Sequence, residues 1–75
     1  MENIERMIDD FRMRLNLIET QIEELSILYS HIASNDINDK RLVKLDGELN
    51  YLEIQQTNLV NRIIDKKQQL RQLMN

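Results

Sequence analysis

The chain has 75 residues, 41% of them hydrophobic, and 10 basic against 13 acidic side chains give a net charge of −3 at pH 7. That length supports one small domain. Without cysteine or proline, and with one glycine and one histidine, the chain lacks the residues for a disulfide framework, a zinc finger, a thiol nucleophile or the usual histidine triads and metal cages.

The first part of the chain, from Ile4 to Ile32, carries apolar residues at alternating steps of four and three. This spacing is the 3.5-residue repeat of a coiled-coil seam, with flanks of charged and amide residues. It predicts one amphipathic helix over about residues 3–33. If Ile8 takes heptad position a, the seam alternates between a and d at Ile4, Ile8, Phe11, Leu15, Ile18, Ile22, Leu25, Tyr29 and Ile32.

The repeat breaks after Ile32. A continued helix would bury Asp36, Asp39 and Asp46 in the seam, which would be prohibitive. Residues 34–39 are also rich in side chains that compete for backbone hydrogen bonds. We therefore expect a turn at about 34–38, with Asn38 as the N-cap of the next helix and Ile37 packed on Leu42 as a hydrophobic staple.

The seam resumes in a second helix, predicted over about residues 39–73. Eight of its ten positions are apolar, and Gln56 and Lys66 are the exceptions. A polar residue in a seam can fix register or be tolerated, and the Lys66 stem can lie along the seam with its ammonium in water. The ten positions are Leu42, Leu45, Leu49, Leu52, Gln56, Leu59, Ile63, Lys66, Leu70 and Leu73.

The two repeats have compatible phases. In an antiparallel pair, residues at one level share a constant sum of residue numbers, and a sum of about 74 pairs every first-helix seam residue with a second-helix one, from Ile4 with Leu70 to Ile32 with Leu42. This favours an all-α, antiparallel two-helix coiled-coil hairpin over the alternative, a parallel dimer with a flexible waist.

A hairpin of this size buries little apolar surface. Without disulfides or metals to stabilise it, we expect it to associate with another chain. Apolar residues off the seam mark the expected interface. This interface would pack against a second copy, which gives a homodimeric four-helix bundle, or against a helix of a partner protein. These residues are Met13, Leu17, Ile27, Leu28, Val43, Tyr51, Ile54, Val60 and Ile64.

Gly47 lies inside the second helix, where glycine costs about 1 kcal/mol relative to alanine. A partner helix that approaches closely near Gly47 and Ile27 would explain it, and so would neutral drift.

Charge is unevenly distributed along the predicted hairpin. Residues 18–57 hold three basic and eight acidic side chains, whereas the open end, residues 1–17 with 58–75, holds seven basic and five acidic ones. The open-end cluster is the basis of an alternative function, accessory nucleic-acid binding, although the overall acidity opposes it. The residues for such contacts are Arg12, Arg14, Arg62, Lys66, Lys67 and Arg71.

Catalytic, cofactor and metal sites are not predicted. The carboxylates lie on solvated helix surfaces with no concave pocket to tune them, and no Gly-rich loop offers a phosphate cradle. No apolar run approaches the ~20 residues of a membrane span, and the start MENIERMIDD is acidic, unlike a signal peptide. We expect a small acidic cytoplasmic protein, and the asparagine and isoleucine content is typical of a phage or low-GC bacterium.

Two family resemblances arise. Arg14-Leu15 followed by Ile22-Glu23-Glu24-Leu25 resembles the N-terminal coiled coil of the SlyX family, which implies a small helical protein. Residues 22–54 resemble in layout the hairpin aspartyl-phosphate phosphatases that regulate sporulation, which implies a response regulator as substrate. Asp46 to Asn50 stand where that family has Ser-Gln-Glu-Leu-Asp; Glu48 and Leu49 match, and Asn50 replaces the final Asp.

Overall fold

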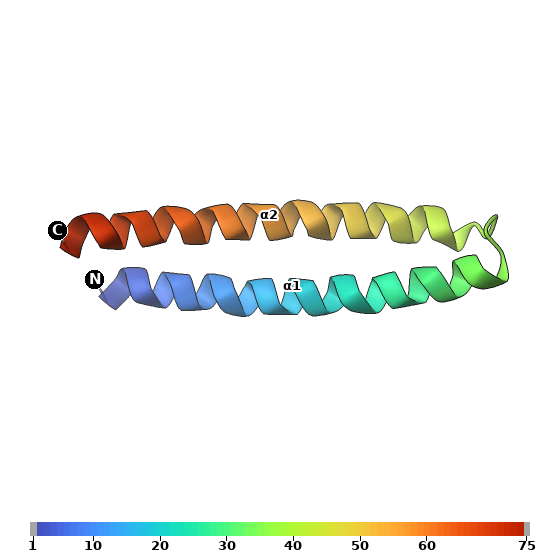
Figure 1. Ribbon diagram of the computed structural model, residues 1–75, viewed down its shortest axis with the longest axis horizontal. Coiled ribbons are helices and arrows are strands. Elements are labelled where there is room, and N and C mark those ends of the chain that lie inside the picture. The colour runs from blue at the N-terminus through green and yellow to red at the C-terminus, as the bar shows by residue number, and fades with distance from the viewer. Residues whose placement is uncertain (1, 75) are drawn as a thin grey trace.

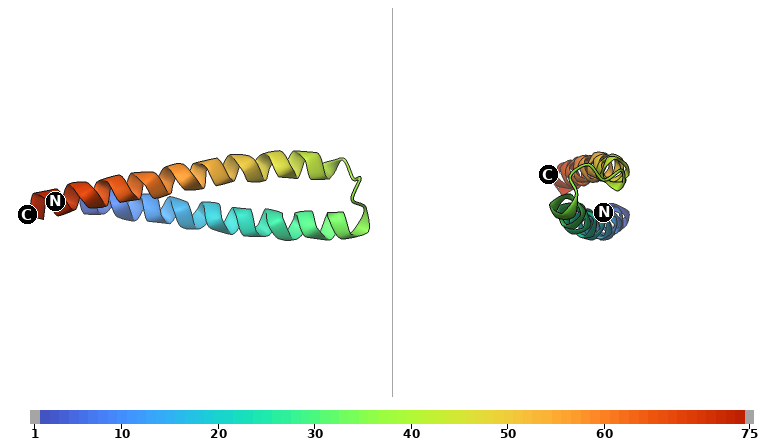
Figure 2. Two further views of the ribbon diagram at one scale, coloured as in Figure 1. Left: turned by 45° about the horizontal axis from the view of Figure 1, so that its top comes forward. Right: turned by 90° about the vertical axis from the view of Figure 1, so that its right-hand side faces the viewer.

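The chain folds into two long helices joined by a short turn. The computed structural model describes residues 2–74, and of Glu2 only its backbone; α1 spans Glu2–Asn35 and α2 spans Arg41–Met74. The helices run antiparallel, so both ends of the described chain lie at the same end of a rod of 56 × 14 × 13 Å (Figure 1). In the left view of Figure 2 the two helices lie apart near the turn and overlap towards the open end, so they are inclined to each other. The expected all-α hairpin is confirmed.

The seam of α1 is buried as predicted. All nine of its residues are buried or half-buried, and among the other described α1 residues only Ala33 is comparably shielded. In α2, Leu42, Leu45, Leu59 and Ile63 are buried. Gln56 and Lys66 are half-buried within the seam. Leu73 differs, with 60% of its surface exposed, because the register places it beyond Ile4, the first seam residue of α1.

Contacts at both ends of the rod match the predicted antiparallel register. Near the turn, Ile32 packs with Leu42 and Leu45, and half-buried Tyr29 and Leu25 complete the cluster. Towards the open end, the guanidinium carbon of Arg62 lies 5.9 Å from the centroid of the Phe11 ring, within the range of a cation–π interaction. The hairpin is therefore aligned along its length and not only at the turn.

The turn is built by two aspartates. Asp36 Oδ1 accepts a hydrogen bond of 3.0 Å from the Asn38 backbone N–H. Asp39 Oδ1 accepts one of 2.9 Å from the Arg41 backbone N–H, so Asp39 is the N-cap of α2. The predicted Asn38 cap is wrong by one residue. The predicted staple is also wrong, because Ile37 is 69% exposed, whereas Leu42 is buried.

The heptad positions divide the surface of the hairpin into two long faces. With a and d in the seam, positions c and g of both helices flank one side and positions b and e flank the other, while f points outward. We call these the c/g face and the b/e face. Since the antiparallel register pairs a of one helix with d of the other, Leu42 is an a position and Leu45 a d position.

Candidate interaction surface

The nine apolar residues expected at an interface are all exposed, from 38% for Val60 to 80% for Val43. The structure does not gather them on one face. Leu17, Leu28 and Tyr51 occupy c and g positions. The b and e positions hold Val43, Val60 and Ile64, and the outward f positions hold Met13, Ile27 and Ile54.

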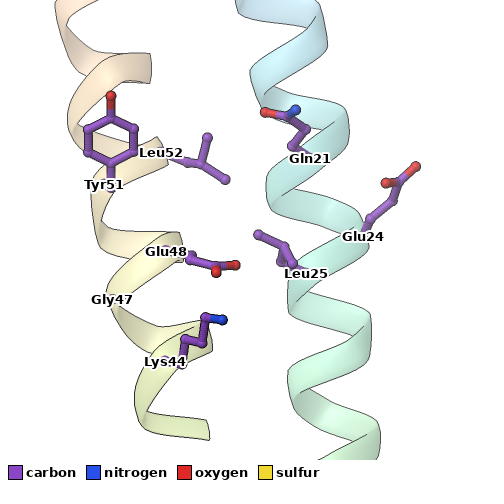
Figure 3. Close-up of a pocket in the computed structure, with 8 residues that line it drawn as sticks. All are labelled: Gln21, Glu24, Leu25, Lys44, Gly47, Glu48, Tyr51 and Leu52. Atoms are coloured by element: carbon purple, nitrogen blue, oxygen red, sulfur yellow. The ribbon is translucent and has the colours of Figure 1, made fainter. Parts of the chain in front are cut away.

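Two adjoining depressions run along the c/g face between the helices. One, of about 620 Å³, lies towards the turn between Leu25 and Leu52 and includes Tyr51 (Figure 3). The other, of about 440 Å³, lies towards the open end and includes Leu17. Gln21 lines both, so the two depressions adjoin, and we call them together the c/g groove.

The part of the groove near the turn is lined by side chains from both helices. In Figure 3, Gln21 and Leu25 of α1 and Glu48 and Leu52 of α2 all point into the space between the two helices. Gly47 lines the same part of the groove on α2 and has no side chain there. A Cβ added at Gly47 would meet nothing within 4 Å. On the α2 wall, Gln55 Nε2 donates a 2.6 Å hydrogen bond to the Tyr51 hydroxyl. The close approach of a partner helix to Gly47 that the sequence suggested stays a prediction.

The ends of the groove carry opposite charges. Arg14 and Arg62 line it towards the open end, and Glu24 and Glu48 line it towards the turn, beside Lys44. Sequence reasoning identified Leu17 and Tyr51 but missed the glutamates, Lys44 and the two glutamines. Their shared c and g positions on facing helices are the signal that would have found them.

The basic residues assigned to nucleic-acid contact are divided between the two faces. Arg14 and Arg62 lie on the c/g face, whereas Arg12, Lys67 and Arg71 occupy e and b positions on the other side of the seam. Lys66 lies in the seam and its Nζ donates to Gln69 Oε1 at 3.4 Å. A single strand of nucleic acid could not follow all six along one face, so nucleic-acid binding stays a prediction.

The carboxylates near the turn are occupied in structural contacts. Asp39 Oδ2 forms an ion pair of 2.8 Å with Arg41 Nη2, and hydrogen bonds from the side chain and backbone of Arg41 lower the pKa of Asp39 from 3.8 to about 2. His31 is exposed at a c position. Within residues 2–74, no three His, Asp or Glu side chains gather as metal ligands would.

The segment that resembles the phosphatase motif winds around α2. Leu49 lies in the seam, Glu48 is at the groove rim, and Asp46 and Asn50 lie on the b/e face. The resemblance and the activity that it implies stay predictions.

No protein-family model matches the chain, and no curated protein or solved structure does either. Neither α1 nor α2, within the described residues, holds a stretch apolar enough to cross a membrane.

Proposed function

We propose that this chain is a non-enzymatic assembly module that self-associates by packing its helices, as a homodimeric four-helix bundle. The observation that carries this proposal is the balance between buried and exposed apolar side chains. Among the described residues, seven hydrophobic residues form the core and none is fully buried, whereas thirteen large hydrophobic side chains are at least 38% exposed.

Self-association would bury part of the apolar surface that a single hairpin leaves exposed. A domain of fewer than about 70 to 80 residues rarely gains enough from one core, and usually adds disulfides, a metal or a second subunit. This chain has no cysteine. A second copy would cover apolar surface that the hairpin cannot cover itself, and pairs of helical hairpins pack readily as four-helix bundles.

Light scattering coupled to size exclusion tests the proposal. Across a tenfold range of protein concentration, we expect a mass of about twice the 9.0 kDa of one chain. The unfolding temperature should rise with concentration, because mass action stabilises an associated state. A mass of one chain at every concentration, with a constant unfolding temperature, would overturn self-association.

A further inference from the structure

The structure also indicates how two copies would meet, an inference that rests on the proposed self-association. We propose that a second copy of this chain docks on the c/g groove in reverse orientation, with the open end of one hairpin over the turn of the other. A two-fold axis at the level of Gln55 would relate the copies. Arg14 and Arg62 would then face the partner's Glu24 and Glu48.

Net charge selects the c/g face over the b/e face. The c and g positions hold four basic residues, Arg14, Arg41, Lys44 and Arg62. They also hold four acidic ones, Asp10, Glu24, Glu48 and Asp65. The described b and e positions hold Arg12, Lys67 and Arg71 against six acidic residues, Glu5, Asp9, Glu19, Glu23, Asp46 and Glu53. Two neutral c/g faces can meet, whereas two b/e faces would each bring a net charge of −3 and repel.

The charges on each helix are arranged symmetrically about one level. On α1, Arg14 and Glu24 lie five residues on either side of position 19. On α2, Arg62 and Glu48 lie seven residues on either side of Gln55. Positions 19 and 55 share the sum of 74 that defines a level in this hairpin, so one two-fold axis serves both helices. Such an axis gives an isologous interface, in which each contact occurs twice.

A third pair of opposite charges follows the same symmetry. Asp65 and Lys44 lie ten and eleven residues on either side of Gln55, so the same axis brings each over its opposite charge on the partner. At the axis, Gln55 carries no charge, and neither does Gln21, two residues from position 19. Their amides can donate to and accept from the same amides of the partner, which keeps the centre of the interface polar but free of repulsion.

The same charges oppose the other two-fold arrangement, in which both open ends lie together and α1 packs on the partner's α2. There Arg14 would lie over the partner's Arg62, and Glu24 over the partner's Glu48. Like charges placed across an interface suppress that pairing. The reversed orientation is therefore the one that the groove favours.

The c/g face is large enough for a stable dimer. The hairpin is 56 Å long and 14 Å across, so one face offers on the order of 800 Å², which is what each partner contributes to an interface of standard size. Leu17 and Tyr51, 67% and 61% exposed, would supply apolar contacts on either side of the axis.

Charge inversion provides the main test. The variant Arg14→Glu with Arg62→Glu carries only acidic residues at both ends of the groove apart from Lys44, and Glu24→Arg with Glu48→Arg carries only basic ones. We expect each variant alone to dimerise at least about tenfold more weakly than the wild type. Mixed in equal amounts, they should form a one-to-one heterodimer, seen by light scattering and native mass spectrometry.

The heterodimer also shows that both variants fold. The matched control is Arg12→Glu with Lys67→Glu, which makes the same change of net charge on the b/e face and should leave dimerisation unchanged. If the groove variants dimerise as tightly as the wild type, or the control variant is the one that weakens, the groove orientation is overturned while self-association stands. A monomeric wild type overturns both proposals.

A cysteine placed at the axis tests the symmetry directly. Since the chain has no cysteine, Gln55→Cys would form a disulfide only with its own copy in a second chain, and we expect rapid crosslinking under mild oxidation. Asn61→Cys, at an outward f position on the same helix, is the control and should crosslink only slowly. Equal rates for the two variants would contradict an axis at Gln55.

Discussion

At the turn, Ile32, Leu42 and Leu45 form one buried cluster and Asp39 caps the start of α2, whereas at the open end Ile8 shares its level with Lys66 and Leu73 is 60% exposed. Both ends follow the same heptad repeat. They differ because chain connection and hydrogen bonds hold the helices together at the turn, while the open end has the polar seam residue Lys66 and the exposed Leu73. The periodicity of the seam therefore determines where the helices touch. The residues at each level determine how stable the contact is there.

The largest expected difference between the two ends comes from truncating an equivalent isoleucine in each. Ile32 and Ile8 are 5% and 6% exposed. Ile32→Ala should lower the free energy of unfolding by about 3 to 4 kcal/mol, because it opens a cavity in a packed cluster, and Ile8→Ala by about 2 kcal/mol. Urea unfolding at one protein concentration measures both. Equal losses would mean that the open end is packed as tightly as the turn.

A smaller effect is expected from Gly47→Ala, which strengthens the turn half. Since a Cβ there meets nothing within 4 Å, the variant should gain about 1 kcal/mol of stability from helix propensity. Asn61→Ala, at the equivalent f position in the open half, is the matched control and should gain less, at most about 0.7 kcal/mol. Thermal unfolding compares them. Weaker dimerisation of the Gly47 variant would instead place a neighbouring helix against that glycine.

The smallest effect should be the acid sensitivity of the turn. The pKa of Asp39 in the folded chain, about 2, lies below its ordinary value of 3.8. Its contribution to stability is therefore complete above about pH 4 and is lost as the pH falls towards 2. The stability difference between wild type and Asp39→Asn should shrink across that window in urea titrations.

Arg41→Leu is the companion variant, because the Arg41 hydrogen bond is the largest cause of the lowered Asp39 pKa. It should remove most of the same acid dependence. If it does not, the backbone hydrogen bond of the cap would be holding the carboxylate in its ionised form without the guanidinium.

The helical seam and its register could be predicted because they rest on many residues at once. Burial of one face of α1 needs nine agreeing positions from Ile4 to Ile32, and the pairing of Ile32 with Leu42 follows from the phase of both repeats. The N-cap rests on one residue, and Asn38 and Asp39 are equally suitable by type. The structure selects Asp39 because its carboxylate reaches both the backbone and the side chain of Arg41.

The interaction surface was harder to predict than the seam. The apolar residues off the seam include Leu17 and Tyr51, but they also include Val43 and Ile64 from the opposite face. What distinguishes the c/g groove is the pattern of its charges across two helices, such as Arg62 with Glu48 and Arg14 with Glu24. That pattern becomes visible only once the register assigns both helices to common levels.

The neighbouring positions of the two chain ends (Figure 1) set how the rod responds to mechanical load. A force that pulls residues 2 and 74 apart acts across the helix axes, so it loads a single layer of the seam at a time. The layers would part in order from Ile4 with Leu70 towards the turn, and the cluster around Ile32 would separate last. A force applied along the rod, between the turn and the open end, runs along both helix axes in the same direction, so it stretches the helices without separating the layers of the seam.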